Sequence, residues 1–222
     1  MMNTIGVNQA KVQIYGPGFS SFVRTLLLLC EEHQIDYSLG FELDDQAIEF
    51  KSEQYLALHP YGKLPILKHN ELVLAETASI GRYLLSTFVP DYPQRYSIVQ
   101  QAKIDSFCAI ASIYLDKAII RDYVLEFAFP KGESGEVRLD VVKAAQPQVL
   151  YALKVIENEL INGECLNSDF FGLADALLAP MLHYLSGLPE GFSLLDKVPE
   201  VEKYFQQLMI RASCQKVLTI KS

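Results

Sequence analysis

The sequence predicts two domains, an α/β domain with a mixed four-stranded sheet followed by an all-α helical domain. In the first 88 residues, short alternating apolar runs and turn signals separate strands from helices. After about residue 96, apolar residues recur at three- and four-residue steps, which is the pattern of amphipathic helices. Two prolines between residues 89 and 95 indicate a linker. We therefore expect domains at 1–88 and 96–222.

In the first domain, strands and helices alternate before a closing hairpin. The expected strands cover 11–15, 37–43, 65–68 and 72–75, and the expected helices cover 20–34, 47–57 and 76–87. Strands joined through a helix pair in parallel, whereas the short turn at Asn70 requires an antiparallel pair. This order predicts a mixed sheet of the thioredoxin-like arrangement.

The second domain should contain helices only. Apolar residues at helical spacing mark one helix around 104–119 and another around 149–160, and the segment PKGESGE at 130–136 separates them. Every element expected after residue 96 is helical, so this region should form a bundle.

Composition and charge exclude several functions. A net charge of −8 without a basic cluster argues against nucleic acid as a partner. The longest apolar runs, such as 26–30, are too short to span a bilayer, so we expect no membrane partner. The N-terminal segment lacks the pattern of a secretory signal, and we expect a cytoplasmic protein. The four cysteines form no C-x-x-C pair, which is against a zinc site or a thioredoxin-type redox pair.

The segment from His59 to Leu84 carries the strongest functional signal. Leu64 precedes Pro65, and a residue before proline is restricted to extended backbone, so its N–H and C=O groups resemble a strand edge. An extended peptide can pair with such an edge. Thr77 stands where a helix begins, and helix N-termini favour anions. Together these features predict a cradle for a small peptide that carries a carboxylate.

This segment resembles the glutathione-binding half of the glutathione S-transferases. The family has a loop of the form Asn-Pro-x-Gly-x-Val-Pro, a hairpin, and a Glu-Ser pair that opens a helix; here HPYGKLP occupies 59–65, and Glu76 and Thr77 form the pair. The resemblance implies that the Leu64–Pro65 peptide bond is cis. It also implies the two-domain architecture over nearly the whole chain.

A second match lies in the segment 168–185, which resembles the family's buried helix of the second domain. The family has Ser or Thr as N-cap and Asp three residues later, in a reciprocal capping box. Here Asp175 is present but the cap position is Gly172, and glycine is only a few tenths of a kcal/mol worse than serine as an N-cap. We therefore expect Asp175 to be structural and not part of an active site.

The resemblance also assigns the residue that activates the thiol of glutathione. The segment from Tyr15 to Glu32 is similar to the serine-type members, which include the plant phi class and its bacterial relatives, and Ser20 takes the catalytic position. Ser21 is the alternative, because a shift of one residue at a helix start is within the error of sequence analysis. Tyr15 lies too early for the tyrosine-type role, and no cysteine is close.

The remaining site residues follow from the same motifs. The resemblance implies that Leu64, beside Pro65, binds glutathione through its backbone, while Glu76 and Thr77 hold the ammonium and carboxylate of the γ-glutamyl group. Lys51 is the candidate for the glycyl carboxylate, and Lys63 is either a second basic contact or a solvated side chain. The residues that could line an apolar electrophile site are Phe19, Phe107, Ala111 and Tyr114, although the last three are equally compatible with ordinary core.

The sequence leaves several functions open on this scaffold. The leading hypothesis is a glutathione transferase that uses glutathione as co-substrate, needs no cofactor or metal, and conjugates it to a small apolar electrophile. The alternatives are a non-catalytic interaction or regulatory protein, and a glutathione-dependent peroxidase or isomerase that uses the same pocket. The resemblance implies a homodimer.

Overall fold

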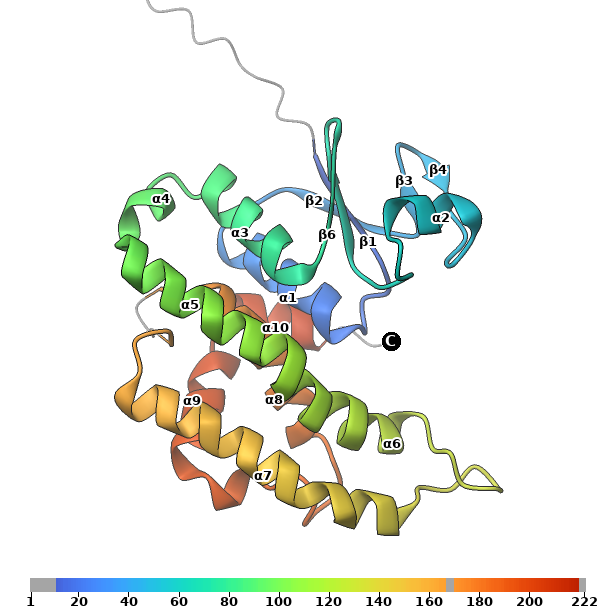
Figure 1. Ribbon diagram of the computed structural model, residues 1–222, viewed down its shortest axis with the longest axis vertical. Coiled ribbons are helices and arrows are strands. Elements are labelled where there is room, and N and C mark those ends of the chain that lie inside the picture. The colour runs from blue at the N-terminus through green and yellow to red at the C-terminus, as the bar shows by residue number, and fades with distance from the viewer. Residues whose placement is uncertain (1–10, 167–169, 220–222) are drawn as a thin grey trace, which may run out of the picture.

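The computed structural model describes residues 11–166 and 170–219, and it has an α/β part followed by a helical part (Figure 1). The α/β part contains the strands β1 (Val12–Tyr15), β2 (Tyr37–Gly40), β3 (Glu42–Leu43), β4 (Gln46–Ala47), β5 (Ile66–His69) and β6 (Leu72–Ala75). Its helices are α1 (Ser21–Glu32), α2 (Glu53–Leu58) and α3 (Thr77–Phe88). The predicted fold class, a thioredoxin-like domain followed by a helical domain, is confirmed.

The main sheet has the strand order β2-β1-β5-β6, with β1 parallel to β2 and the other pairs antiparallel. The parallel pair is joined through α1, and the β5–β6 hairpin turns at Asn70, whose φ is 56°. The side chains of Val12 and Ile14 are buried, as the alternation of the first strand predicts. The mixed sheet therefore follows from the connections that the sequence encodes.

The prediction of a helix over 47–57 is wrong in its first half. Residues 42–47 form a small hairpin, β3–β4, and α2 begins only at Glu53. Asp44 and Asp45 both have positive φ at the hairpin turn, a conformation that short polar residues tolerate. Ser52 then sets the helix start, because its hydroxyl accepts a hydrogen bond from the N–H of Tyr55.

The helical part begins within the expected linker, where α4 (Tyr92–Arg95) forms a single turn. A continuous helix then runs from Ile98 to Ala128 through α5 (Ile98–Ile110), η1 (Ala111–Val124) and α6 (Leu125–Ala128), with π-type winding in η1. The remaining helices are α7 (Leu139–Asn162), α8 (Leu173–Ser186), η2 (Leu195–Lys197), α9 (Pro199–Met209) and α10 (Ala212–Leu218). Among the residues that the structure describes, no helix is long and apolar enough to cross a membrane.

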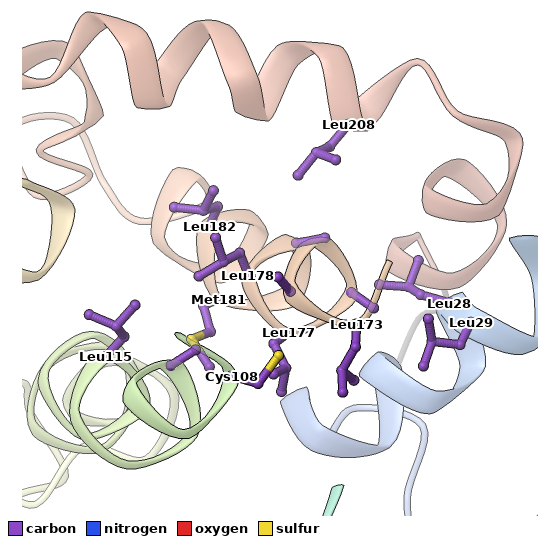
Figure 2. Close-up of a cluster of buried hydrophobic side chains, with 14 of the residues drawn as sticks. Leu28, Leu29, Cys108, Leu115, Leu173, Leu177, Leu178, Met181, Leu182 and Leu208 are labelled. Atoms are coloured by element: carbon purple, nitrogen blue, oxygen red, sulfur yellow. The ribbon is translucent and has the colours of Figure 1, made fainter. Parts of the chain in front are cut away.

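Helix α8 is the centre of the hydrophobic core and joins the two parts of the molecule (Figure 2). Most of its residues are buried, which is the pattern of a helix surrounded by other elements. Figure 2 shows Leu177 and Met181 directed toward α5 and η1, while Leu208 approaches α8 from α9. Helix α1 packs extensively against α8, so the start of α1 is held by both domains.

Close packing between the domains depends on a glycine in α3. A Cβ atom at Gly81 would overlap the side chain of Leu173 at the start of α8 and would lie 3.1 Å from Leu29 Cδ1. The absence of a side chain at position 81 therefore lets α3, α1 and α8 meet at one point.

The start of α8 agrees with the prediction for Asp175. Its carboxylate accepts a hydrogen bond of 2.9 Å from the N–H of Gly172, the N-cap, and another of 2.6 Å from the hydroxyl of Tyr204 on α9. Ser168, where the matching segment begins, lies outside the described residues. The structural role of Asp175 is confirmed.

Candidate active site

Three loops meet at one edge of the main sheet. Tyr15 at the end of β1 pairs with Ile66 at the start of β5, and Ile66 pairs with Ala75 at the end of β6. The residues that follow β1, precede β5 and follow β6 must therefore leave the sheet on the same side. These are the segments that hold Ser20, Leu64 and Thr77, so the topology alone brings the three predicted site regions together.

The loops that follow β1 and β6 both contact the segment 59–65. A Cβ atom at Gly16 would lie 3.5 Å from Leu64 Cδ2, so the Leu64 side chain covers the start of the β1–α1 loop. His59 Nε2, at the end of α2, lies 3.8 Å from Glu76 Oε1, directly before α3. Both the first and the last loop of the candidate site are therefore joined to the segment 59–65.

Ser20 is the N-cap residue of α1 and has extended backbone dihedrals, φ −69° and ψ 130°. Its carbonyl accepts the first helical hydrogen bond, from the N–H of Arg24, but its side chain makes no capping bond to the helix. Ser21 is already the first helical residue. The Ser20 hydroxyl is half-buried and, within the described part of the chain, is not used to satisfy the helix end.

The Leu64–Pro65 peptide bond is cis, which confirms the expectation from the resemblance. Pro65 is buried and Leu64 half-buried. Within residues 11–166 and 170–219, no hydrogen bond to the backbone N–H or C=O of Leu64 is present. A half-buried peptide group without a partner is costly, and pairing with an extended ligand removes that cost.

The start of α3 presents unused N–H groups to the same edge. Thr77 is the first helical residue and is buried, while Glu76 has a positive φ of 69° and an exposed side chain. Neither provides a side-chain cap for the helix. The first N–H groups of a 12-residue helix thus remain available to an anion, and the Glu76 carboxylate stands beside them for a cation.

Both predicted basic contacts are exposed lysines near the loop that precedes Pro65. The side chain of Lys51 approaches Gly62, because a Cβ at position 62 would lie 3.8 Å from Lys51 Cγ. Lys63 is exposed, and its carbonyl accepts a hydrogen bond from the hydroxyl of Tyr55. The structure therefore places Lys51 at the site edge, and Lys63 in the loop itself.

The four candidate residues for the electrophile are not alike. Phe107 and Ala111 are buried in the hydrophobic core, which is the ordinary role that the sequence left open, because their helix turns this face inward. Phe19 is 48% exposed beside Ser20, and Tyr114 is 65% exposed on η1. Only Phe19 and Tyr114 present their rings to the surface.

The Tyr15 hydroxyl and the Cys108 and Cys214 thiols are poor candidates for activating a thiol, because they are buried. The Tyr15 hydroxyl donates a hydrogen bond of 2.7 Å to the carbonyl of Ile48, and burial raises its pKa. Burial raises the pKa of the Cys108 thiol to about 12 and that of the Cys214 thiol to about 11. Within the described residues there is no cluster of His, Cys, Asp and Glu that could hold a metal ion. Among the described residues of this edge, the Ser20 hydroxyl at the start of α1 is therefore the candidate for activating a thiol.

Sequence analysis missed one group close to Ser20. The hydroxyl of Tyr184, on α8, donates a hydrogen bond to the carbonyl of Phe19. The two residues lie 165 positions apart, and no local signal in the sequence around either of them indicates the contact. Only the packing of α8 against α1 brings Tyr184 to the loop.

The fold and this edge define a class of protein. It combines a thioredoxin-like domain, which presents an unpaired peptide group and a helix start without a side-chain cap, with a helical domain packed beside a serine hydroxyl. Comparison with known proteins identifies the family within this class.

Two family models match the chain. The N-terminal domain model of the glutathione S-transferases matches residues 19–87, and the C-terminal domain model matches residues 117–212. Together they cover well over half of the chain, which therefore belongs to the glutathione S-transferase family.

Individual relatives agree along nearly the whole length. Glutathione S-transferase 4 of Zea mays is 29% identical over 93% of this chain and 91% of its own. A probable glutathione S-transferase GSTF1 of Oryza sativa subsp. japonica is 27% identical over 94% of this chain and 96% of its own. The solved structure of a glutathione S-transferase-I bound with lactoylglutathione has a TM-score of 0.79 and 25% identity, and the match covers 96% of this chain and 100% of that one.

Proposed function

We propose that this protein conjugates glutathione to small apolar electrophiles and that the Ser20 hydroxyl activates the thiol. The observation that carries the proposal is the unused Ser20 hydroxyl at the N-terminus of α1. It lies at the same sheet edge as the free backbone of Leu64 and the uncapped start of α3. A tripeptide with two carboxylates, an ammonium and a thiol matches these groups.

Each of the three residues of glutathione meets a different group of the site. The backbone of Leu64 pairs with the cysteinyl residue, as a strand edge pairs with an extended peptide. The γ-glutamyl carboxylate meets Thr77 and the N-terminus of α3, and Glu76 accepts from the ammonium. Lys51, with Lys63 nearby, faces the glycyl carboxylate at the other end.

The energetics of activation match what the site offers. A free thiol has a pKa of about 8.5, and a reduction by two units requires about 2.7 kcal/mol of thiolate stabilisation. A hydrogen bond from Ser20 to the anion contributes about 1.5–3 kcal/mol, and the N-terminus of α1 adds about 0.3–2 kcal/mol. Their sum, about 1.8–5 kcal/mol, is of the required size without a general base.

The reaction then proceeds by direct attack. The thiol releases its proton to solvent, and the thiolate accepts a hydrogen bond from Ser20. Its electron pair forms a C–S bond with the electrophilic carbon, whose leaving group departs with the bonding pair. The exposed rings of Phe19 and Tyr114 are the candidates for apolar contacts with that electrophile, and positioning it beside the thiolate increases the rate.

The test is the ultraviolet thiolate band of saturating glutathione between pH 5 and 9. We expect the wild-type protein to show the band well below the pH at which free glutathione titrates. Ser20→Ala should retain glutathione but lose the low-pH band and about 10–100-fold in kcat, because it lacks the hydrogen bond to the anion.

Ser21→Ala is the matched control, since Ser21 is the neighbouring serine but lies inside the helix. It should behave like the wild type. An unchanged band in Ser20→Ala, or a loss confined to Ser21→Ala, would contradict the assignment. If the wild type shows no band with glutathione saturating, the transferase mechanism fails and an interaction protein becomes the better interpretation.

The family resemblance also implies an oligomeric state. We propose a homodimer, and sedimentation should give a species of twice the 25.0 kDa chain. A monomer at working concentration would contradict it.

A further inference from the structure

The two peptide groups directly before Ser20 are held by side chains from two different helices. Arg24, on α1, donates through Nε to the carbonyl of Gly18 at 2.9 Å. Tyr184, on α8 of the helical domain, donates its hydroxyl to the carbonyl of Phe19. Consecutive carbonyls of the β1–α1 loop are thus fixed from both domains.

The two donors also contact each other. Arg24 Cζ lies 4.9 Å from the centroid of the Tyr184 ring, in a cation–π arrangement, and Arg24 is only 3% exposed. The Tyr184 side chain is itself half-buried between the domains. Arg24 and Tyr184 therefore form one packed pair that contacts both carbonyls of the Gly18–Phe19 segment.

The Ser20 hydroxyl is connected to this pair through the backbone. Because the Ser20 side chain makes no capping bond to α1, its position depends on the backbone before it. The N–H of Ser20 donates to the carbonyl of Pro17, and the Phe19 carbonyl, part of the same peptide group as that N–H, is held by Tyr184. Loss of the Tyr184 hydrogen bond removes one of these two restraints and leaves the bond from the Ser20 N–H to Pro17, so the peptide plane can tilt and carry the Ser20 hydroxyl with it.

We propose that Tyr184, stacked on Arg24, is a positioning residue for the Ser20 hydroxyl, so that the helical domain takes part in thiol activation as well as in electrophile binding. The inference rests on the proposed function, because it assigns Tyr184 a role only through Ser20. The simpler interpretation is that Tyr184 merely joins the two domains. The interpretations differ in what happens to the bound thiol.

Tyr184→Phe tests the difference with a minimal change. It keeps the ring over Arg24 and removes only the hydrogen bond to Phe19. We expect the thiolate band to move to higher pH and kcat at pH 7 to fall about 3–10-fold, with KM for glutathione changed less than twofold. The glutathione-binding groups at Leu64 and Thr77 are untouched, which is why KM should hold.

Tyr123→Phe is the matched control. Tyr123 is a buried tyrosine whose hydroxyl, like that of Tyr184, donates to a backbone carbonyl: a hydrogen bond of 2.8 Å to Phe192 within the helical domain. It has no contact with the Gly18–Ser20 loop among the described hydrogen bonds. The thiolate band should stay at its wild-type pH in this variant, whatever the effect on stability.

The double variant Ser20→Ala/Tyr184→Phe supplies the decisive comparison. If Tyr184 acts through Ser20, the second substitution should add less than twofold to the loss caused by the first. Fully multiplying losses, or a thiolate band in Tyr184→Phe identical to that in Tyr123→Phe, would overturn the inference. Failure of the proposed function would be visible earlier, in the wild type and in Ser20→Ala alone.

Arg24→Lys provides a second route that does not alter Tyr184. Lysine keeps the positive charge but lacks the planar guanidinium that both donates to Gly18 and stacks on the ring. We expect the same displacement of the thiolate band as in Tyr184→Phe. A band at the wild-type pH in folded Arg24→Lys would also contradict the inference.

Discussion

The N-termini of α1 and α8 differ in how their first N–H groups are satisfied. At α8, Asp175 accepts a hydrogen bond from the N–H of Gly172 and another from the hydroxyl of Tyr204, and its side chain is buried. At α1, the N-cap hydroxyl of Ser20 makes no capping bond and remains half-buried at the sheet edge. The start of α8 is therefore capped by a side chain, whereas the start of α1 has no side-chain cap.

Other serines show that the open end is a local property. Ser52 at α2 and Ser97 at α5 are also N-cap residues with extended backbone, and both accept a hydrogen bond of 3.2 Å from the third helical N–H. Ser20 has similar dihedrals but does not make this bond. Ser52 and Ser97 therefore cap their helices, whereas the Ser20 hydroxyl makes no capping bond.

We expect the largest loss of stability from removing the cap at the start of α8. Asp175→Ala removes the acceptor of two buried donors, Gly172 N–H and Tyr204 O–H. At about 1–3 kcal/mol for each of the two unpaired donors, the free energy of unfolding at pH 5 should fall by about 2–6 kcal/mol. Urea unfolding measures this. A change below 1 kcal/mol would show that α8 does not depend on this cap.

The next effect is a pH dependence of the stability that Asp175 contributes at the start of α8. Burial raises the pKa of Asp175 to about 6, from an ordinary value of 3.8. A raised pKa means that the folded state holds the proton more tightly than the unfolded state. The stabilising contribution is therefore complete below about pH 4 and is lost as the pH rises through about 6.

The measurement compares unfolding of the wild type and Asp175→Ala between pH 4 and 7. The difference between their unfolding free energies should shrink by about 2 kcal/mol over this range. Subtracting the variant removes contributions from His33 and His183, whose pKa values are lowered by burial in both proteins. A constant difference would place the pKa of Asp175 near its ordinary value.

The smallest effect contrasts the capping serine with the open one. Ser97→Ala removes the hydroxyl that caps α5 and should lower the free energy of unfolding by about 1 kcal/mol, with no change in activity. Ser20→Ala should change stability by less than about 0.5 kcal/mol, since no capping bond is lost. Equal losses of stability would show that Ser20 caps α1 in solution.

The sequence predicts the parts of the site that depend on local backbone. Pro65 restricts Leu64, and the strand order places Ser20, Leu64 and Thr77 at one sheet edge, as the structure has them. The hairpin at 42–47 was missed, because the positive φ of Asp44 and Asp45 ends one strand and begins another within a segment of helical composition.

The contacts that depend on packing were not predictable. The hydrogen bond from Tyr184 to Phe19 requires α8 to lie across α1, which local propensity does not encode. Likewise Phe107, Ala111 and Tyr114 were candidates for one apolar site, yet Phe107 and Ala111 are core and Tyr114 is exposed. The register of that helix was the missing information.

The glycine at position 81 has a consequence for recombination between relatives. Leu173 occupies the space beside Gly81, so the halves of this protein fit each other by shape as well as through the Tyr184 hydrogen bond. A chimera that takes its first 88 residues from a relative with a larger side chain at this position would separate α3 from α8. We therefore expect chimeras between relatives to be more stable when the glycine and the leucine come from the same parent.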